Sequence, residues 1–154
     1  MYRLKPFLAR RRGFTMIELM IAVTVLAILS AVAYPTFMDA IRKGRRADAY
    51  AALALAMQAE ERHRTNNTAY SESLTDLGLS SASPEGLYAL SVVAGSASAT
   101  AYVVQASAKS DRSQTADTNC RTLRVTVSAG SIVYSSLNSA GAVYTATPDR
   151  CWTK

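Results

Sequence analysis

The chain has few of the residues that most often build catalytic and metal centres. Its 154 residues include one histidine, one tryptophan and two cysteines. His63 lies between Arg62 and Arg64, without the convergent partners that a metal or catalytic site needs. Cys120 and Cys151 lack zinc-site spacing, and the glycines form neither a P-loop nor a dinucleotide-binding motif. The sequence therefore predicts a protein with no catalytic residues, no metal and no cofactor, and not an enzyme.

Negative charge is absent before Gly13, where five of the 17 basic residues gather. Without those five, the remaining basic residues almost balance the 11 acidic ones, although the whole chain carries a formal charge of +6. Basic residues on the cytoplasmic side of an apolar segment fix its orientation. We therefore attribute the basic pI to membrane orientation and not to nucleic-acid binding. The five residues are Arg3, Lys5, Arg10, Arg11 and Arg12.

A long apolar run extends from Leu19 to Met38 without a single charged residue. Its 20 residues would span about 30 Å as a helix, which is the thickness of a hydrocarbon core. A secretory signal has a shorter apolar run, followed by a small-residue cleavage site. Here the best small-residue junction, Gly13, precedes the run, so we expect the apolar helix to be retained.

The helical pattern continues past Pro35, where we expect a kink, and through the segment from Asp39 to Arg64. A helix over residues 14–64 would be about 75 Å long, so half of it must protrude from a domain of this size. Apolar residues at helical spacing predict one buried face on the second half. That predicted face consists of Ala47, Tyr50, Ala51, Ala54 and Met57.

Short strand-like runs follow the helix. Leu87–Val93, Ala101–Ala108 and Thr122–Ser128 are bounded by turn residues, and Ile132–Tyr134 can add a fourth strand. The predicted fold class is α+β: a long N-terminal α-helix with its C-terminal half packed on a small antiparallel β-sheet.

The two cysteines are predicted to pair if this part of the chain lies outside the cytoplasm. A disulfide between Cys120 and Cys151 would close a ring of about 32 residues and stabilise the fold by roughly 3.7 kcal/mol in the chain-entropy description. The alternative is a pair of free thiols.

Glu18 places a carboxylate at the edge of the apolar run. Such a group costs about 2.5–3.5 kcal/mol at membrane depth unless it has a partner. Cleavage after Gly13 would create a cation one helical turn away, the α-amine of Phe14. Glu18 could pair with the amine of its own chain or of a neighbouring chain, and the second arrangement would fix the register between subunits. The alternative is a carboxylate that is tolerated in the headgroup region.

The segment Arg11-Arg12-Gly13-Phe14-Thr15-Met16-Ile17-Glu18-Leu19 resembles the processing site of type IV pilins and related pseudopilins. The resemblance implies cleavage after Gly13 by the prepilin peptidase, N-methylation of Phe14, and pairing of Glu18 with a neighbouring subunit's N-terminus. Pro35 falls where the helix of this family is kinked. Later segments resemble minor pilins of the PilE type, and Cys120 with Cys151-Trp152 resembles the C-terminal disulfide loop of that group.

The resemblance also implies a domain organisation. Residues 1–13 would be a cleaved leader, residues 14–38 a transmembrane and filament-core helix, and residues 39–154 an amphipathic helix half plus a globular head with a disulfide loop over 120–151. The implied partners are other pilin subunits, the prepilin peptidase, the inner-membrane assembly machinery, and membrane lipid before assembly. The head would lie in the periplasm before assembly and at the cell surface, in the pilus, afterwards. The implied role is that of a minor pilin supporting pilus biogenesis, twitching motility and adhesion.

Two alternatives share this N-terminus. A type II secretion pseudopilin would be absent from extracellular pili. A DNA-uptake pilin would bind DNA through its head during natural transformation, and the candidate contacts are Arg121 and Arg124, near aromatic residues of the C-terminal part.

Overall fold

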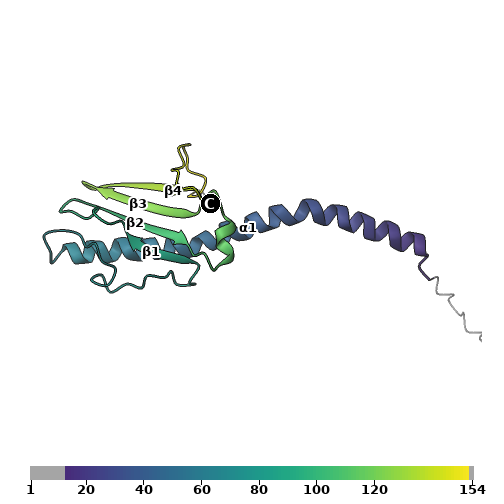
Figure 1. Cartoon of the computed structure of the whole chain (residues 1–154), viewed down its shortest axis with the longest axis horizontal. Helices are drawn as coiled ribbons and strands as arrows, with labels where there is room; N and C mark the ends of the chain where they lie inside the picture. Colours follow the sequence, from purple (N-terminus) through teal and green to yellow (C-terminus); the bar gives the residue numbers. More distant parts are fainter. Residues whose placement is uncertain (1–12, 153–154) are drawn as a thin grey trace, which may run out of the picture. The chain divides into compact units, whose positions relative to one another are not determined.

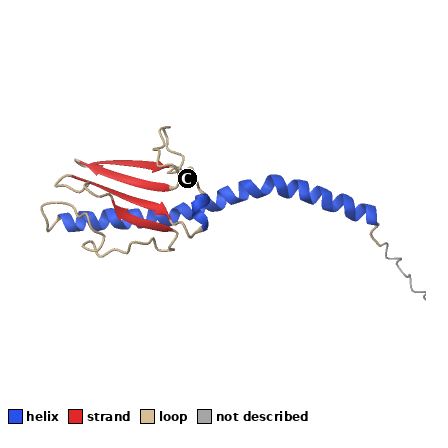
Figure 2. Cartoon of the chain, in the orientation of Figure 1, coloured by secondary structure: helices blue, strands red, loops and turns tan. Residues whose placement is uncertain are grey.

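The computed structural model describes residues 13–152, which form one long helix and one four-stranded antiparallel sheet (Figure 2). The predicted α+β fold class is confirmed. The chain divides into two compact units, Met1–Met38 and Asp39–Lys154, and the boundary falls inside the helix. The elements are α1 (Met16–Arg64), β1 (Tyr88–Val92), β2 (Ala101–Ala108), the 3-10 helix η1 (Ser113–Ala116), β3 (Thr122–Ser128) and β4 (Ser131–Leu137).

In its described residues, the first unit contains a short non-helical segment, residues 13–15, followed by the apolar part of α1. Its most apolar 18-residue window has a mean hydropathy of 2.4, and none of that window is buried. Large side chains such as Phe14, Met16 and Ile17 are 84%, 78% and 68% exposed. A helix that is apolar on every side must be buried in lipid or against other helices.

The second unit is a meander in which the strands follow their order in the sequence, β1-β2-β3-β4 (Figure 1). Strand residues alternate between the core and the outer face, as along β2, where Tyr102, Val104 and Ala106 are fully buried. The part of α1 after Asp39 presents small residues to this sheet. Such residues allow the helix backbone to approach closely while tyrosine, leucine and valine side chains of the strands fill the layer. These small residues are Ala49, Ala52, Ala56 and Ala59.

The predicted buried face of the second helix half was wrong. Ala47, Ala51 and Ala54 are exposed, and only Tyr50 and Met57 are half-buried. The true face includes the alanines named above, Leu53, and three polar residues, Arg46, Asp48 and Glu60. Alanine lies on both sides of this helix and gives little contrast between them. The polar residues also concealed the face, because their burial depends on partners that are distant in the sequence.

The fourth strand is longer than the predicted Ile132–Tyr134. β4 pairs with β3 along its whole length, from Ser128↔Ser131 to Thr122↔Leu137. The strands are joined by Ala129 and Gly130, both with positive φ, at 48° and 80°. A two-residue turn with this geometry matches the right-handed twist of a hairpin and so sets the register.

Candidate functional site

The helix start carries a reciprocal pair of hydrogen bonds around Glu18. The backbone N–H of Glu18 donates to Oγ1 of Thr15 at 3.2 Å, and the N–H of Thr15 donates to a carboxylate oxygen of Glu18 at 3.5 Å. This is a capping box, in which two otherwise unpaired N–H groups are satisfied by side chains. The pattern Thr-x-x-Glu at residues 15–18 is the sequence signal that predicts such a helix start. Among residues 13–152, no ion pair involves Glu18.

The other predicted features of this segment also fall within α1. Pro35 lies inside the continuous helix, and the structure does not test the predicted kink. Gly13 and Phe14 precede the helix and are exposed. The predicted leader lies outside the described residues, apart from Gly13.

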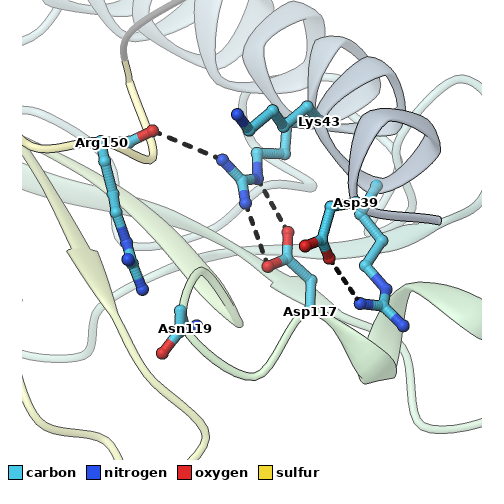
Figure 3. Close-up of a pocket in the computed structure, with 7 residues that line it drawn as sticks. Asp39, Lys43, Asp117, Asn119 and Arg150 are labelled. Carbon is cyan, nitrogen blue, oxygen red and sulfur yellow. Dashed lines mark hydrogen bonds and ion pairs between the residues drawn. The ribbon is translucent and has the colours of Figure 1, made fainter. Parts of the chain in front are cut away.

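A basic pocket opens on the head beside the first turns of α1 that follow Asp39 (Figure 3). Its volume is about 300 Å³. Four cationic side chains line it against two carboxylates, which gives a formal net charge of +2. The pocket was not predicted from the sequence, because its residues come from three separate stretches of the chain. The lining residues are Asp39, Arg42, Lys43, Arg46, Asp117, Asn119 and Arg150.

A buried ion pair forms one wall of the basic pocket. Nε and Nη2 of Arg46 donate to the two carboxylate oxygens of Asp117 at 2.7 and 3.0 Å, and both side chains are less than 10% exposed. Gln114 is fully buried and donates from Nε2 to Asp117 and to the carbonyl of Arg42, each at 3.2 Å. Burial alone would lower the pKa of Arg46, but the hydrogen bond and charge of Asp117 outweigh it and leave the pKa raised. This wall is therefore charged and fixed in place.

Cys120 and Cys151 form a disulfide, and both residues are fully buried. Each lies immediately after a residue of the basic pocket, Asn119 or Arg150. The disulfide therefore ties together two segments that line the pocket.

The C-terminal end is held by an aromatic cluster. The ring of Trp152 stacks on Tyr50 of α1 with centroids 5.1 Å apart and lies 4.8 Å from the ring of Tyr134 on β4. Its indole N–H donates to the carbonyl of Ser135 at 2.9 Å, and the hydroxyl of Tyr50 donates to the carbonyl of Cys151. Trp152 thus packs within the head in this structure.

The two candidate DNA contacts, Arg121 and Arg124, are half-buried and make internal hydrogen bonds. Nη1 of Arg121 donates to the carbonyl of Thr115 at 3.1 Å, and Nη2 of Arg124 donates to Gln105 at 3.0 Å. Arg124 lies on the outer face of the sheet, since its strand neighbours Leu123 and Val125 are both core residues. Neither arginine lines the basic pocket.

An exposed apolar helix segment, a helix-on-sheet head and a C-terminal disulfide together define a pilin-like subunit. Comparison with known families agrees with this class. Residues 8–34 match the prokaryotic N-terminal methylation motif. Residues 35–124 match the family described as type IV minor pilin ComP, DNA uptake sequence receptor. The second match covers more than half of the chain, and the protein belongs to this family of type IV minor pilins.

A curated relative supports the same assignment. The type IV major pilin protein PilA of Myxococcus xanthus (strain DK1622) is 33% identical over 76 residues, which is 49% of this chain. Those residues cover 34% of PilA, so the chain matches about a third of that protein's length. The predicted resemblance to minor pilins is confirmed, and the protein is a minor subunit of the type IV pilus. Proteins of these families are structural.

Proposed function

We propose that this minor pilin enters the filament through residues 14–38, which act first as a membrane anchor and then as part of the filament core. The observation that carries the proposal is that no residue in the apolar window of α1 is buried. Small residues in the segment allow other helices to approach closely, both in lipid and in a protein core. These residues are Ala22, Ala27, Ser30, Ala31 and Ala33.

The proposed N-terminus is created by cleavage after Gly13, which removes the leader 1–13 and frees the amine of Phe14 for methylation. A prepilin peptidase performs this step, and the inner-membrane assembly machinery receives the product. Replacing Gly13 with a bulky residue should block processing. Mass spectrometry of the N-terminus tests this, and a mature chain beginning at Phe14 in that variant contradicts it.

Glu18 pairs with the Phe14 amine of a neighbouring subunit during assembly in this proposal. The carboxylate has no cationic partner among the described residues. An unpaired carboxylate in an apolar environment costs free energy, and this cost favours pairing with a cation of another subunit. Glu18→Ala should leave the chain in the membrane but reduce its amount in sheared pili.

A matched variant separates pairing from helix capping. Thr15→Ala removes one half of the capping box and keeps the carboxylate, so it should assemble much better than Glu18→Ala. Equal recovery of Glu18→Ala and wild type in sheared pili would refute the pairing. Equal losses in the two variants would assign the defect to capping.

The head, residues 39–154, lies in the periplasm before assembly and on the pilus surface afterwards. The disulfide supports this placement, because such bonds persist in oxidising compartments. Accessibility of the head to protease added to spheroplasts tests the orientation. The subunit supports pilus biogenesis and, through the pilus, twitching motility and adhesion, which deletion of its gene should impair.

DNA uptake is a second candidate function, favoured by the description of the matched family as a DNA uptake sequence receptor. Arg121 and Arg124 remain the proposed contacts. To bind DNA, each would have to break its hydrogen bond to an acceptor within the head and donate to a DNA phosphate instead. Fluorescence anisotropy with labelled duplex DNA should give an affinity that falls with salt. Arg121→Gln with Arg124→Gln should weaken it, whereas Arg62→Gln with Arg112→Gln removes equal charge elsewhere and should not.

A further inference from the structure

The basic pocket has the chemistry of a phosphate site. Its two carboxylates already have arginine partners: Asp39 pairs with Arg42 at 2.8 Å, and Asp117 pairs with Arg46. Lys43 has no hydrogen bond or ion pair within residues 13–152. The ammonium of Lys43 is therefore available to an anion, and the Arg150 guanidinium, which also lies over the ring of Tyr144, adds positive charge to the same pocket.

Polar donors surround the same space. The Lys43 ammonium carries three donors, and the side-chain amide of Asn119, which also lines the pocket, makes no hydrogen bond within the described chain. The guanidinium of Arg46 is held in the wall by Asp117 and the carbonyl of Arg150 (Figure 3). A fixed wall lowers the ordering cost that a ligand must overcome.

The position of the pocket along the chain favours a lipid headgroup as the source of the phosphate that it would bind. Arg42 and Lys43 follow Met38, the last residue of the apolar run, by four and five residues. At about 1.5 Å per helical residue, these positions lie about 6–8 Å beyond the apolar run along α1. The headgroup layer on each side of a bilayer is about 5–8 Å thick. Lysine and arginine at such positions extend their charged ends toward lipid headgroups.

We propose that the basic pocket binds the phosphate of an anionic phospholipid while the subunit waits in the membrane. The lipid partner rests on the proposed membrane placement, whereas the phosphate chemistry of the pocket does not. Lipid binding would hold the head at the membrane surface. To enter the filament, the subunit would then have to withdraw its apolar helix from the bilayer and also release one lipid headgroup from the pocket.

The test uses the full chain, solubilised in dodecyl maltoside and titrated with phosphatidylglycerol or phosphatidylcholine under native mass spectrometry. Phosphatidylglycerol should bind more tightly, since its headgroup carries no compensating cation. Lys43→Gln with Arg150→Gln should weaken phosphatidylglycerol binding by about 25-fold, because each of the two cations near a lipid surface contributes about fivefold. The control, Arg62→Gln with Arg112→Gln, removes the same charge outside the pocket and should bind as wild type does.

Four outcomes would overturn the proposal. The first is equal affinity of wild type for the two lipids, and the second is equal weakening in the pocket and control variants. The third is inorganic phosphate binding as tightly as phosphatidylglycerol, which would make the pocket a site for a free anion. The fourth is a pocket variant that loses duplex DNA binding and keeps lipid binding. The lipid titration is performed in detergent and does not require filament assembly. A negative outcome of the Glu18 experiment would therefore not affect the result of the titration. Lys43→Gln alone, at an exposed position without a described partner, should weaken binding about fivefold and guards against misfolding of the double variant.

Discussion

The buried ion pair between Arg46 and Asp117 offers a sharp test of how the head is stabilised. Asp117→Ala would leave a guanidinium that is 9% exposed without its two hydrogen bonds of 2.7 and 3.0 Å. Gln114 would also lose an acceptor. Removing one partner of a buried pair costs about 3–5 kcal/mol, because the remaining charge stays desolvated. This is a large part of the roughly 5–15 kcal/mol that keeps a domain folded.

The measurement is urea unfolding of the oxidised fragment that begins at Asp39, which corresponds to a compact unit with its own core. With an m-value of about 2 kcal/mol/M, the midpoint should fall by about 1.5–2.5 M. Arg46→Met should cost a similar amount. The double variant Arg46→Met with Asp117→Leu should lie near wild type, because apolar replacement of both charges removes the desolvation cost as well.

The exposed pair between Asp39 and Arg42 is the matched control. Its 2.8 Å distance resembles that of the buried pair, but the Asp39 side chain is 67% exposed. Asp39→Ala should therefore cost less than about 1 kcal/mol. A cost for Asp117→Ala as small as for Asp39→Ala would refute the reasoning, and so would a double variant as unstable as the sum of its singles.

Three further predictions concern the fold of the head. Replacing Cys120 and Cys151 with alanine should destabilise the oxidised fragment by about 3–4 kcal/mol, measured from urea midpoints, because the sequence separation of 31 residues makes the lost chain constraint large. Burial raises the pKa of Glu60 above its ordinary value despite the hydrogen bond from Ser71. The stability that protonated Glu60 contributes is therefore fully present below the ordinary carboxyl pKa. It is lost as the pH rises through the raised pKa of the folded state. Glu60→Gln should remove this loss, and unfolding midpoints at pH 5 and pH 8 should lie closer together than in wild type. Ala129→Asn should stabilise by about 1 kcal/mol in thermal or urea unfolding, because Ala129 has a φ of 48° that asparagine tolerates better, and unchanged stability would contradict the turn assignment.

The features that could be predicted from the sequence are those determined by residues that lie close together along the chain. The apolar run, the helix end at Arg64 and the extents of β2 and β3 follow from charge-free length, helix-compatible composition and short β-branched runs between turn residues. The pilin class also followed from a local feature, the continuous segment from Arg11 to Leu19. Such patterns need no distant contact to be recognised.

Other features depended on how distant parts of the chain meet. The buried face of α1 was mispredicted because Asp48 lies in the core only when Ser83, Glu85 and Leu87 supply donors to its carboxylate. β4 continues past Tyr134 because β3 supplies backbone pairing partners for Ser135, Ser136 and Leu137.

The basic pocket shows the same division most clearly. No sequence motif distinguishes its cations, which are spread from Arg42 to Arg150. The disulfide, the buried Arg46–Asp117 pair and the packing of α1 on the sheet bring them to one place. By itself the sequence determined that the chain has an apolar helix, a preceding segment that resembles a pilin processing site, and a small α+β head. Only the tertiary structure decided which charges share a pocket, because electrostatic fields depend on distance in space and not on separation along the chain.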